Sequence, residues 1–164
     1  MSIDESLIQE IVQRILSVAC PKRIILFGSA ATAEMSRDSD IDLLVVEDDP
    51  SSYILICKLL QPLNYQIIHT KDGEEAVNVV RDHPHIDLIL MDLKLPHLDG
   101  YSATKAIKKM HPEIPVIAQT AYAMPGDREK ALKAGCDEYL TKPLDTRKLL
   151  DIIAGYLTDK KDTP

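Results

Sequence analysis

The sequence lacks the features of several large classes of protein. None of its apolar runs approaches the ~20 residues that a membrane-spanning helix needs. Its N-terminus has no basic segment followed by an apolar core of the kind that marks a secretion signal. It has no CxxC pair, and its three cysteines, Cys20, Cys57 and Cys136, are widely separated. We therefore expect a cytoplasmic protein with reduced thiols and no membrane contact.

Basic residues are also fewer than acidic ones. The chain carries 19 lysines and arginines against 26 aspartates and glutamates, which gives a formal net charge of −7. Such a balance disfavours a broad basic surface for DNA or RNA, so nucleic acid is not an expected partner. The 164 residues, of which 45% are hydrophobic, suit one domain with a buried core, with or without an appendage.

From Leu43 onward, short apolar runs alternate with amphipathic stretches, which is typical of a parallel α/β sheet. The expected strands are 43–46, 66–70, 88–91, 115–119 and 138–141. The expected helices are 51–60, 72–81, 101–110, 127–134 and 145–156, the first of them with Asp49 as its cap and Pro50 in its first turn. Five strands alternating with five helices predict a flavodoxin-like, doubly wound parallel sheet, preceded by an N-terminal helix-strand appendage.

Polar residues follow four of these apolar runs at the point where each expected strand ends. Glu47 and Asp48 follow the first strand, Asp92 the third, Thr120 the fourth and Lys142 the fifth. The carboxyl ends of parallel strands lie along one edge of the sheet, where ligands bind. Carboxylates, a hydroxyl and an ammonium at that edge predict a site for a divalent metal and a phosphoryl group.

The segments that carry these residues are LLVVEDD, LILMDLKLPHLDG, IPVIAQTAYA and EYLTKP, in this order. Together they resemble the receiver domain of two-component response regulators over residues 43–157. The resemblance implies a signalling domain rather than an enzyme. Asp92 would accept a phosphoryl group from a phosphohistidine on a histidine kinase or a histidine phosphotransfer protein. The Lys142–Pro143 peptide bond matches one that is often cis in this family.

The resemblance also implies a magnesium site. Asp48 and Asp92 would be direct ligands, Glu47 would bind directly or through water, and the carbonyl group of Lys94 would supply a further oxygen. Magnesium in proteins takes one or two carboxylates together with water and phosphate oxygens, so these residue types suit it. Asp49 is better interpreted as a helix cap than as a ligand.

Further residues would respond to the phosphoryl group. Lys142 would pair with one of its oxygens, Thr120 would hydrogen-bond another and draw its loop inward, and the ring of Tyr139 would turn inward in step. Lys94 and Tyr122 match positions where side chains gate attacking water in this family. A long lysine and a bulky tyrosine there predict slow self-dephosphorylation. Each residue alone has an ordinary structural explanation, and the expectation rests on the set.

Residues 1–42 do not follow the alternation of strands and helices. A helical apolar stripe and a short strand lead into Gly28 and Ser29, and Asp40 and Asp42 come later. This pattern resembles the minimal nucleotidyltransferase signature, in which the Gly-Ser turn cradles a triphosphate and the two aspartates bind metals. Metal-dependent nucleotidyl transfer by these residues is the alternative function.

The match to that signature is incomplete, because Thr32 and Ala33 stand where Arg-Gly is common and the strand that brings a third carboxylate is missing. We therefore interpret the N-terminal motif as vestigial, and its junction with the receiver-like part as a natural or engineered chimera. The apolar face of the first helix needs a partner, either its own receiver or a second copy, and we favour a homodimer. The expected domains are 1–42, 43–158 and a polar tail at 159–164.

Overall fold

The computed structural model describes residues 41–158 apart from 64, 84 and 122–125, so the predicted N-terminal helix, strand and Gly-Ser turn lie outside it. Five strands form one parallel sheet in the order β2-β1-β3-β4-β5. The order reverses at β1, as in doubly wound sheets. This is the flavodoxin-like α/β fold that the alternating sequence predicts. The strands are β1 (Asp42–Val46), β2 (Gln66–Thr70), β3 (Leu88–Asp92), β4 (Val116–Thr120) and β5 (Glu138–Thr141).

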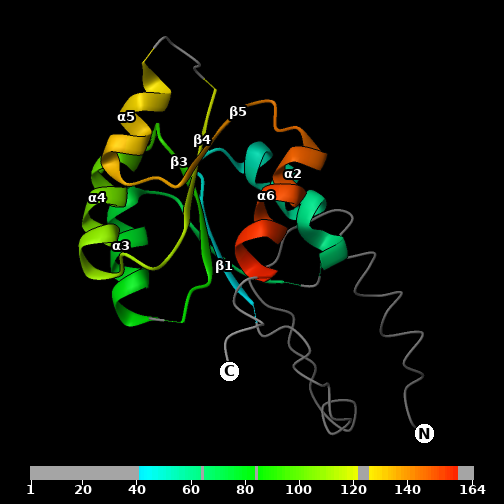
Figure 1. The fold of residues 1–164 in the computed structure, drawn as a ribbon, viewed down its shortest axis with the longest axis horizontal. Coiled ribbons are helices and arrows are strands. Elements are labelled where there is room, and N and C mark those ends of the chain that lie inside the picture. Colours follow the sequence, from blue (N-terminus) through cyan, green and yellow to red (C-terminus); the bar gives the residue numbers. More distant parts are fainter. Residues whose placement is uncertain (1–40, 64, 84, 122–125, 159–164) are drawn as a thin grey trace, which may run out of the picture.

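Helices cover both faces of the sheet (Figure 1). On one face lie α3 (Gly73–Asp82), α4 (Gly100–Met110) and α5 (Asp127–Ala134). On the other lie α2 (Pro50–Leu60), which runs into the 3₁₀ helix η2 (Gln61–Leu63), and α6 (Thr146–Thr158). Within the described part of the chain, none of the helices combines the length and the apolar character needed to cross a membrane.

Three aspartates fix the starts of the helices that follow β1, β2 and β3. The side chains of Asp49, Asp72 and Asp99 each accept a hydrogen bond from the backbone N–H three residues further on, at 2.7, 2.8 and 3.0 Å. Such caps satisfy backbone donors that the first helical turn leaves without partners. They therefore fix the point at which each of these helices begins, next to the edge of the sheet that carries the site.

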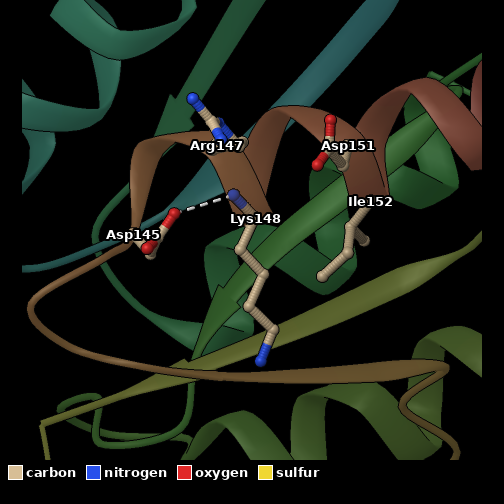
Figure 2. Close-up of a pocket in the computed structure, with 5 residues that line it drawn as sticks. All are labelled: Asp145, Arg147, Lys148, Asp151 and Ile152. Atoms are coloured by element: carbon tan, nitrogen blue, oxygen red, sulfur yellow. Dashed lines mark hydrogen bonds between the residues drawn. The ribbon is translucent and has the colours of Figure 1, made fainter.

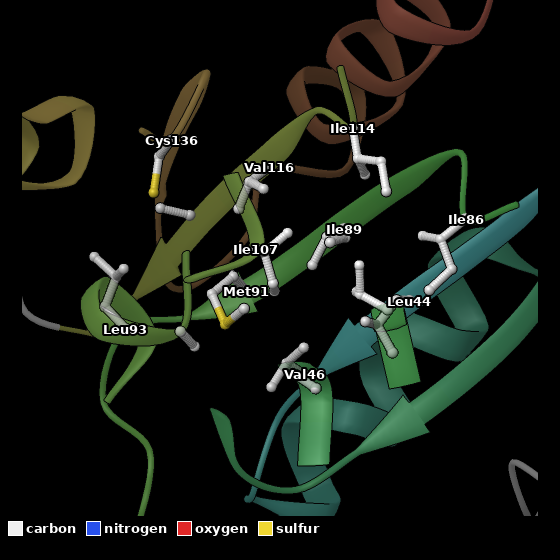
Figure 3. Close-up of a cluster of buried hydrophobic side chains, with 14 of the residues drawn as sticks. Leu44, Val46, Ile86, Ile89, Met91, Leu93, Ile107, Ile114, Val116 and Cys136 are labelled. Atoms are coloured by element: carbon white, nitrogen blue, oxygen red, sulfur yellow. The ribbon is translucent and has the colours of Figure 1, made fainter. Parts of the chain in front are cut away.

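The sheet is buried between two apolar layers. All five residues of β3 and all five of β4 are buried. Side chains alternate across a strand, so Val46 and Met91 pack under α3, α4 and α5, whereas Val45 and Leu90 pack under α2 and α6. Figure 3 shows the first layer, in which Ile107 of α4 lies beside Met91. A parallel sheet covered on both faces explains why the strands are continuously apolar in sequence.

A glycine allows α4 to approach β3 directly behind Asp92. A Cβ atom on Gly100 would lie 2.1 Å from the backbone oxygen of Asp92 and 2.8 Å from the Cα of Leu93. The backbone N–H of Gly100 donates to the carbonyl of Leu93 at 3.1 Å. Any side chain at Gly100 would push the helix away from the strand end, so this glycine helps to place Asp92.

Candidate functional site

The strand ends bring four charged side chains into one cleft, as the sequence predicts. Because Val46 and Met91 are paired in the sheet, Glu47 and Asp92 leave β1 and β3 side by side. One carboxylate oxygen from each of Glu47, Asp48 and Asp92 can be chosen so that all lie within 4.8 Å of one another. The cleft has a volume of about 430 Å³ and is lined by Glu47, Asp48, Asp49, Ser52, Asp92, Lys94, Leu95, Pro96, Ala121 and Lys142.

Asp92 is held with its two oxygens in different environments. It is 5% exposed. Its Oδ1 accepts a hydrogen bond from the backbone N–H of Lys94 at 2.8 Å, and its Oδ2 lies 2.5 Å from Nζ of Lys142. An amide on one oxygen and an ammonium on the other fix the plane of the carboxylate. Asp92 is therefore oriented before any ligand arrives.

Glu47 is the most deeply buried of the acids, with an exposure of 1%. Its Oε2 accepts from Nζ of Lys142 at 2.6 Å, and its Oε1 accepts from the backbone N–H of Asp49 at 3.3 Å. Burial raises the pKa of Glu47, and the bond from Lys142 acts in the opposite direction. For Lys142, burial works to lower the pKa, but its hydrogen bonds to Asp92 and Glu47 outweigh this and raise it.

The three carboxylates form a donor set that fits magnesium. Glu47 and Asp92 are buried, whereas Asp48 is exposed at the mouth of the cleft. Magnesium prefers oxygen ligands and keeps several of its waters. One solvent-facing carboxylate beside two buried ones offers anionic oxygens while leaving access for water. The structure thus brings together the side chains that the sequence nominates as metal ligands.

The two residues predicted to switch lie on neighbouring strands, Thr120 at the end of β4 and Tyr139 two residues before the end of β5. Thr120 is 5% exposed and ends β4 opposite Thr141, and its carbonyl accepts from the N–H of Lys142 at 2.7 Å. The half-buried ring of Tyr139 packs against the layer under α3, α4 and α5. Tyr122, the second predicted gate, lies outside the described residues.

Comparison with known protein families shows which family has a matching sequence. The sequence model of the family described as "Response regulator receiver domain" matches residues 43–154. The chain belongs to the response regulator receiver family. It is a domain of two-component signalling, as the four sequence segments indicate.

Relatives and solved structures support the same assignment. The polar-differentiation response regulator DivK of Brucella ovis is 40% identical over 119 residues, which cover 71% of this chain and 96% of DivK. The receiver domain of the sensor histidine kinase PA1611 from Pseudomonas aeruginosa PAO1, solved with magnesium coordinated in its active site cleft, is 40% identical. Its TM-score is 0.66, over 71% of this chain and 96% of that one. The co-crystal structure of the Saccharomyces cerevisiae histidine phosphotransfer protein Ypd1 and the Ssk1 receiver domain contains a chain that is 31% identical. It gives a TM-score of 0.65 over 71% and 88% of the two chains.

Two buried polar residues of the receiver site were not predicted from the sequence. Nε2 of Gln119 donates to Oε2 of Glu47 at 3.2 Å, and Nε2 of His69 lies 2.9 Å from the backbone oxygen of Glu47. Gln119 and His69 are the penultimate residues of β4 and β2. A polar residue just before the end of an apolar strand is the signal that marks both.

Asp42 lies apart from the receiver site. It opens β1 at the end opposite Glu47, so the length of the strand, about 15 Å, separates the two. Its N–H donates to Oδ2 of Asp87 at 2.9 Å, and burial, followed by the charge of Asp87, raises its pKa. The other three residues of the nucleotidyltransferase-like motif, Gly28, Ser29 and Asp40, lie outside the described residues.

A second depression, of about 540 Å³, lies along the first turns of α6. Figure 2 shows Arg147 and Asp151 pointing to one side of the helix and Lys148 and Ile152 to the other. Asp145 caps the helix by accepting from the N–H of Lys148 at 2.9 Å. The side chains diverge, so this larger depression gathers no chemical groups toward a ligand, in contrast to the receiver cleft.

The chain enters α6 through a cis peptide bond between Lys142 and Pro143. The resemblance to receivers implied this isomer, and the structure confirms it. The bond lies directly after the lysine that contacts Glu47 and Asp92.

Proposed function

We propose that Asp92 accepts a phosphoryl group from a phosphohistidine of a partner protein. The observation that carries the proposal is the pairing of Asp92 with both Lys142 and the acidic cluster. Its Oδ2 contacts the ammonium, while Glu47 and Asp48 lie within reach of a shared cation. A carboxylate is a weak nucleophile, so transfer to it depends on positioning and on neutralised charge.

The proposed transfer replaces a bond between phosphorus and an imidazole nitrogen with a bond between phosphorus and an oxygen of Asp92. An oxygen of Asp92 attacks the phosphorus in line with the phosphoramidate bond, the bond to the imidazole nitrogen breaks, and the partner's imidazole takes up a proton. Lys142 turns from Asp92 to an oxygen of the transferred group and stabilises its charge. The carboxylates of Glu47, Asp48 and Asp92 would hold magnesium, which would supply further positive charge for the transfer.

We propose that Glu47, Asp48 and Asp92 take different parts in binding magnesium. Asp48 at the mouth of the cleft and Asp92 would be the direct magnesium ligands, together with the carbonyl of Lys94. Glu47 would bind directly or through water, and its oxygens also accept hydrogen bonds from Lys142, Gln119 and Asp49. The magnesium in the cleft of the PA1611 receiver domain supports a metal at this edge.

The proposed output is a change at the surface around α5 and β5. Thr120 hydrogen-bonds a phosphoryl oxygen and moves toward Asp92, and Tyr139 turns inward behind it. The half-buried position of Tyr139 against the apolar layer supports this, since the ring already has part of its surface inside. The phosphodonor is a histidine kinase or a histidine phosphotransfer protein, a partner class supported by the complex of Ypd1 with the Ssk1 receiver domain.

For the rest of the chain we propose a receiver at 43–158 and an appendage at 1–42 that is structural or dimerising. The molar mass of the full chain in solution, measured at several concentrations, tests the homodimer. A concentration-independent monomer would rule it out. Gly28, Ser29, Asp40 and Asp42 form the vestigial nucleotidyltransferase motif of this proposal.

Binding of beryllofluoride, a phosphoryl analogue, tests the proposed function. The full chain should bind it only with Mg²⁺ present, and Asp92→Asn should abolish binding. Asp151→Asn on the exposed face of α6 is the matched control and should bind normally. Binding that survives Asp92→Asn would overturn the proposal. Metal-dependent binding of a nucleoside triphosphate that is lost in Asp42→Ala would instead favour nucleotidyl transfer.

A further inference from the structure

His69 is buried beside the turn that carries the acids. Its Nε2 lies 2.9 Å from the backbone oxygen of Glu47. A carbonyl oxygen only accepts hydrogen bonds, so Nε2 must carry a proton and donate. The backbone N–H of Glu47 donates to the carbonyl of Thr70, where β2 ends. The imidazole therefore donates to the carbonyl of Glu47, directly after the end of β1.

The ring of His69 is held in place by Tyr53. The two rings are stacked, with centroids 3.6 Å apart and planes inclined by 6°. Tyr53 lies in the first turn of α2, and its backbone N–H donates to the carbonyl of Asp49 at 3.0 Å. Stacking against a ring on a capped helix limits the rotation of the imidazole and keeps its N–H directed at Glu47.

These contacts form a closed circuit around Asp48. The circuit runs from the Glu47 carbonyl to His69, from its ring to Tyr53, and from the N–H of Tyr53 to the carbonyl of Asp49. Within it, the N–H of Asp49 donates to Oε1 of Glu47 at 3.3 Å. The peptide groups on both sides of Asp48 are thus fixed by hydrogen bonds, while its side chain faces solvent at the cleft.

We propose that His69 is a positioning residue for the magnesium site. By donating to the carbonyl that precedes Asp48, it sets the plane of that peptide and so the direction of the Asp48 carboxylate toward Asp92. The inference rests on the proposed function, because it concerns the metal of the same site. Groups that orient metal ligands without touching the metal are a large part of the affinity of such sites.

Titration of the full chain with MgCl₂ alone, followed by calorimetry, tests this role. His69→Phe keeps a ring that can stack on Tyr53 but removes the donor, and its Kd for Mg²⁺ should rise about tenfold. Tyr53→Leu leaves the imidazole in place without its stacking partner, so its Kd should rise in the same direction by a smaller factor. This second variant keeps the test decisive should His69→Phe fail to fold. Ile153→Val, a change on the buried side of α6, is the control for lost stability and should leave Kd unchanged.

The outcomes separate the inference from the function on which it rests. If the unaltered chain binds Mg²⁺ and the His69 and Tyr53 variants bind it equally well, the inference is overturned and the proposed site stands. An equal rise of Kd in Ile153→Val would also overturn it, because general loosening would then be the cause. Failure of the unaltered chain to bind Mg²⁺ would overturn both.

Discussion

Lys142 bridges two acids that come from different strands. Its Nζ lies 2.6 Å from Oε2 of Glu47 and 2.5 Å from Oδ2 of Asp92. Glu47 is 1% exposed and Asp92 5%, so neither charge is well screened by water. One cation between two buried anions offsets their mutual repulsion. Lys142 therefore stabilises the fold in addition to its proposed role toward the phosphoryl group.

Replacing this lysine should destabilise the protein in a way that magnesium partly repairs. Lys142→Met leaves Glu47 and Asp92 without their cation, and we expect a loss of about 2 kcal/mol in the free energy of unfolding in metal-free buffer. Magnesium returns positive charge to the cluster, so the loss should shrink when it is added. Urea unfolding with and without Mg²⁺ measures both values.

Lys130→Met is the matched control for that experiment. Lys130 is 69% exposed and lies 3.4 Å from Asp127, so its ion pair is screened by water. Its replacement should change the free energy of unfolding by less than about 0.5 kcal/mol, with or without Mg²⁺. Equal effects of the two lysine variants would contradict the bridging role of Lys142.

Two glycine-to-alanine substitutions should change the stability of the protein in opposite directions. Gly100→Ala places a Cβ 2.1 Å from the backbone oxygen of Asp92, so α4 must shift, and we expect a loss of about 2 kcal/mol or more. Gly155 lies inside α6, and a Cβ added there would meet nothing within 4 Å, so Gly155→Ala should gain up to about 1 kcal/mol in stability. Urea midpoints of the two variants give the comparison. Similar shifts in both would show that close approach to Asp92 does not constrain Gly100.

Gln119 should stabilise the fold through the hydrogen bond that its side-chain N–H donates to Glu47. Gln119→Leu places an apolar side chain at this buried position and removes the N–H group that donates to Oε2 of Glu47. We expect the free energy of unfolding to fall by about 1 kcal/mol. Gln119→Glu has nearly the same shape and places a second carboxylate against Glu47, so it should cost more than the leucine. Thermal melting of both variants at neutral pH gives the order. A glutamate variant as stable as the leucine variant would contradict this contact.

Most of the fold was predictable from the sequence, because its signals are local. Apolar runs marked β1 and β3, and the Asp49 cap marked the start of α2. The predicted and observed ends of the strands and helices differ by no more than two residues. The shared strand edge then placed Asp48, Asp92 and Lys142 together. His69 and Gln119 escaped prediction because their partners, the backbone and side chain of Glu47, belong to a different strand, and strand order is not a local signal.

Cys136 should resist alkylation in the folded protein. It is 4% exposed, and burial raises the pKa of its thiol above the ordinary value. The reactive thiolate therefore forms only at a higher pH than in the unfolded chain, and reagent has little access. Iodoacetamide at about pH 8, near the ordinary pKa of a thiol, should label Cys136 slowly in buffer and fast in urea, as followed by peptide mass spectrometry. Equal rates in the two conditions would contradict the burial of this thiol.

Phosphorylated Asp92 should lose its phosphoryl group slowly. Lys94 is exposed and lines the cleft, and its backbone N–H holds Oδ1 of Asp92 at 2.8 Å, so its side chain starts beside the group that water must attack. A long side chain there competes with the attacking water for space. Lys94→Asn combined with Tyr122→Glu opens that approach and offers polar groups to orient the water.

The decay of phosphorylated protein after removal of the donor measures this effect. The Lys94 and Tyr122 double variant should decay several times faster than the unaltered chain, with the same urea midpoint. Lys105→Asn, an exposed change on α4 outside the cleft, should decay at the original rate. A double variant that decays no faster would show that neither side chain limits the access of water. The lifetime would then have to be set by the groups that contact Asp92 directly, of which Lys142 is the first to test.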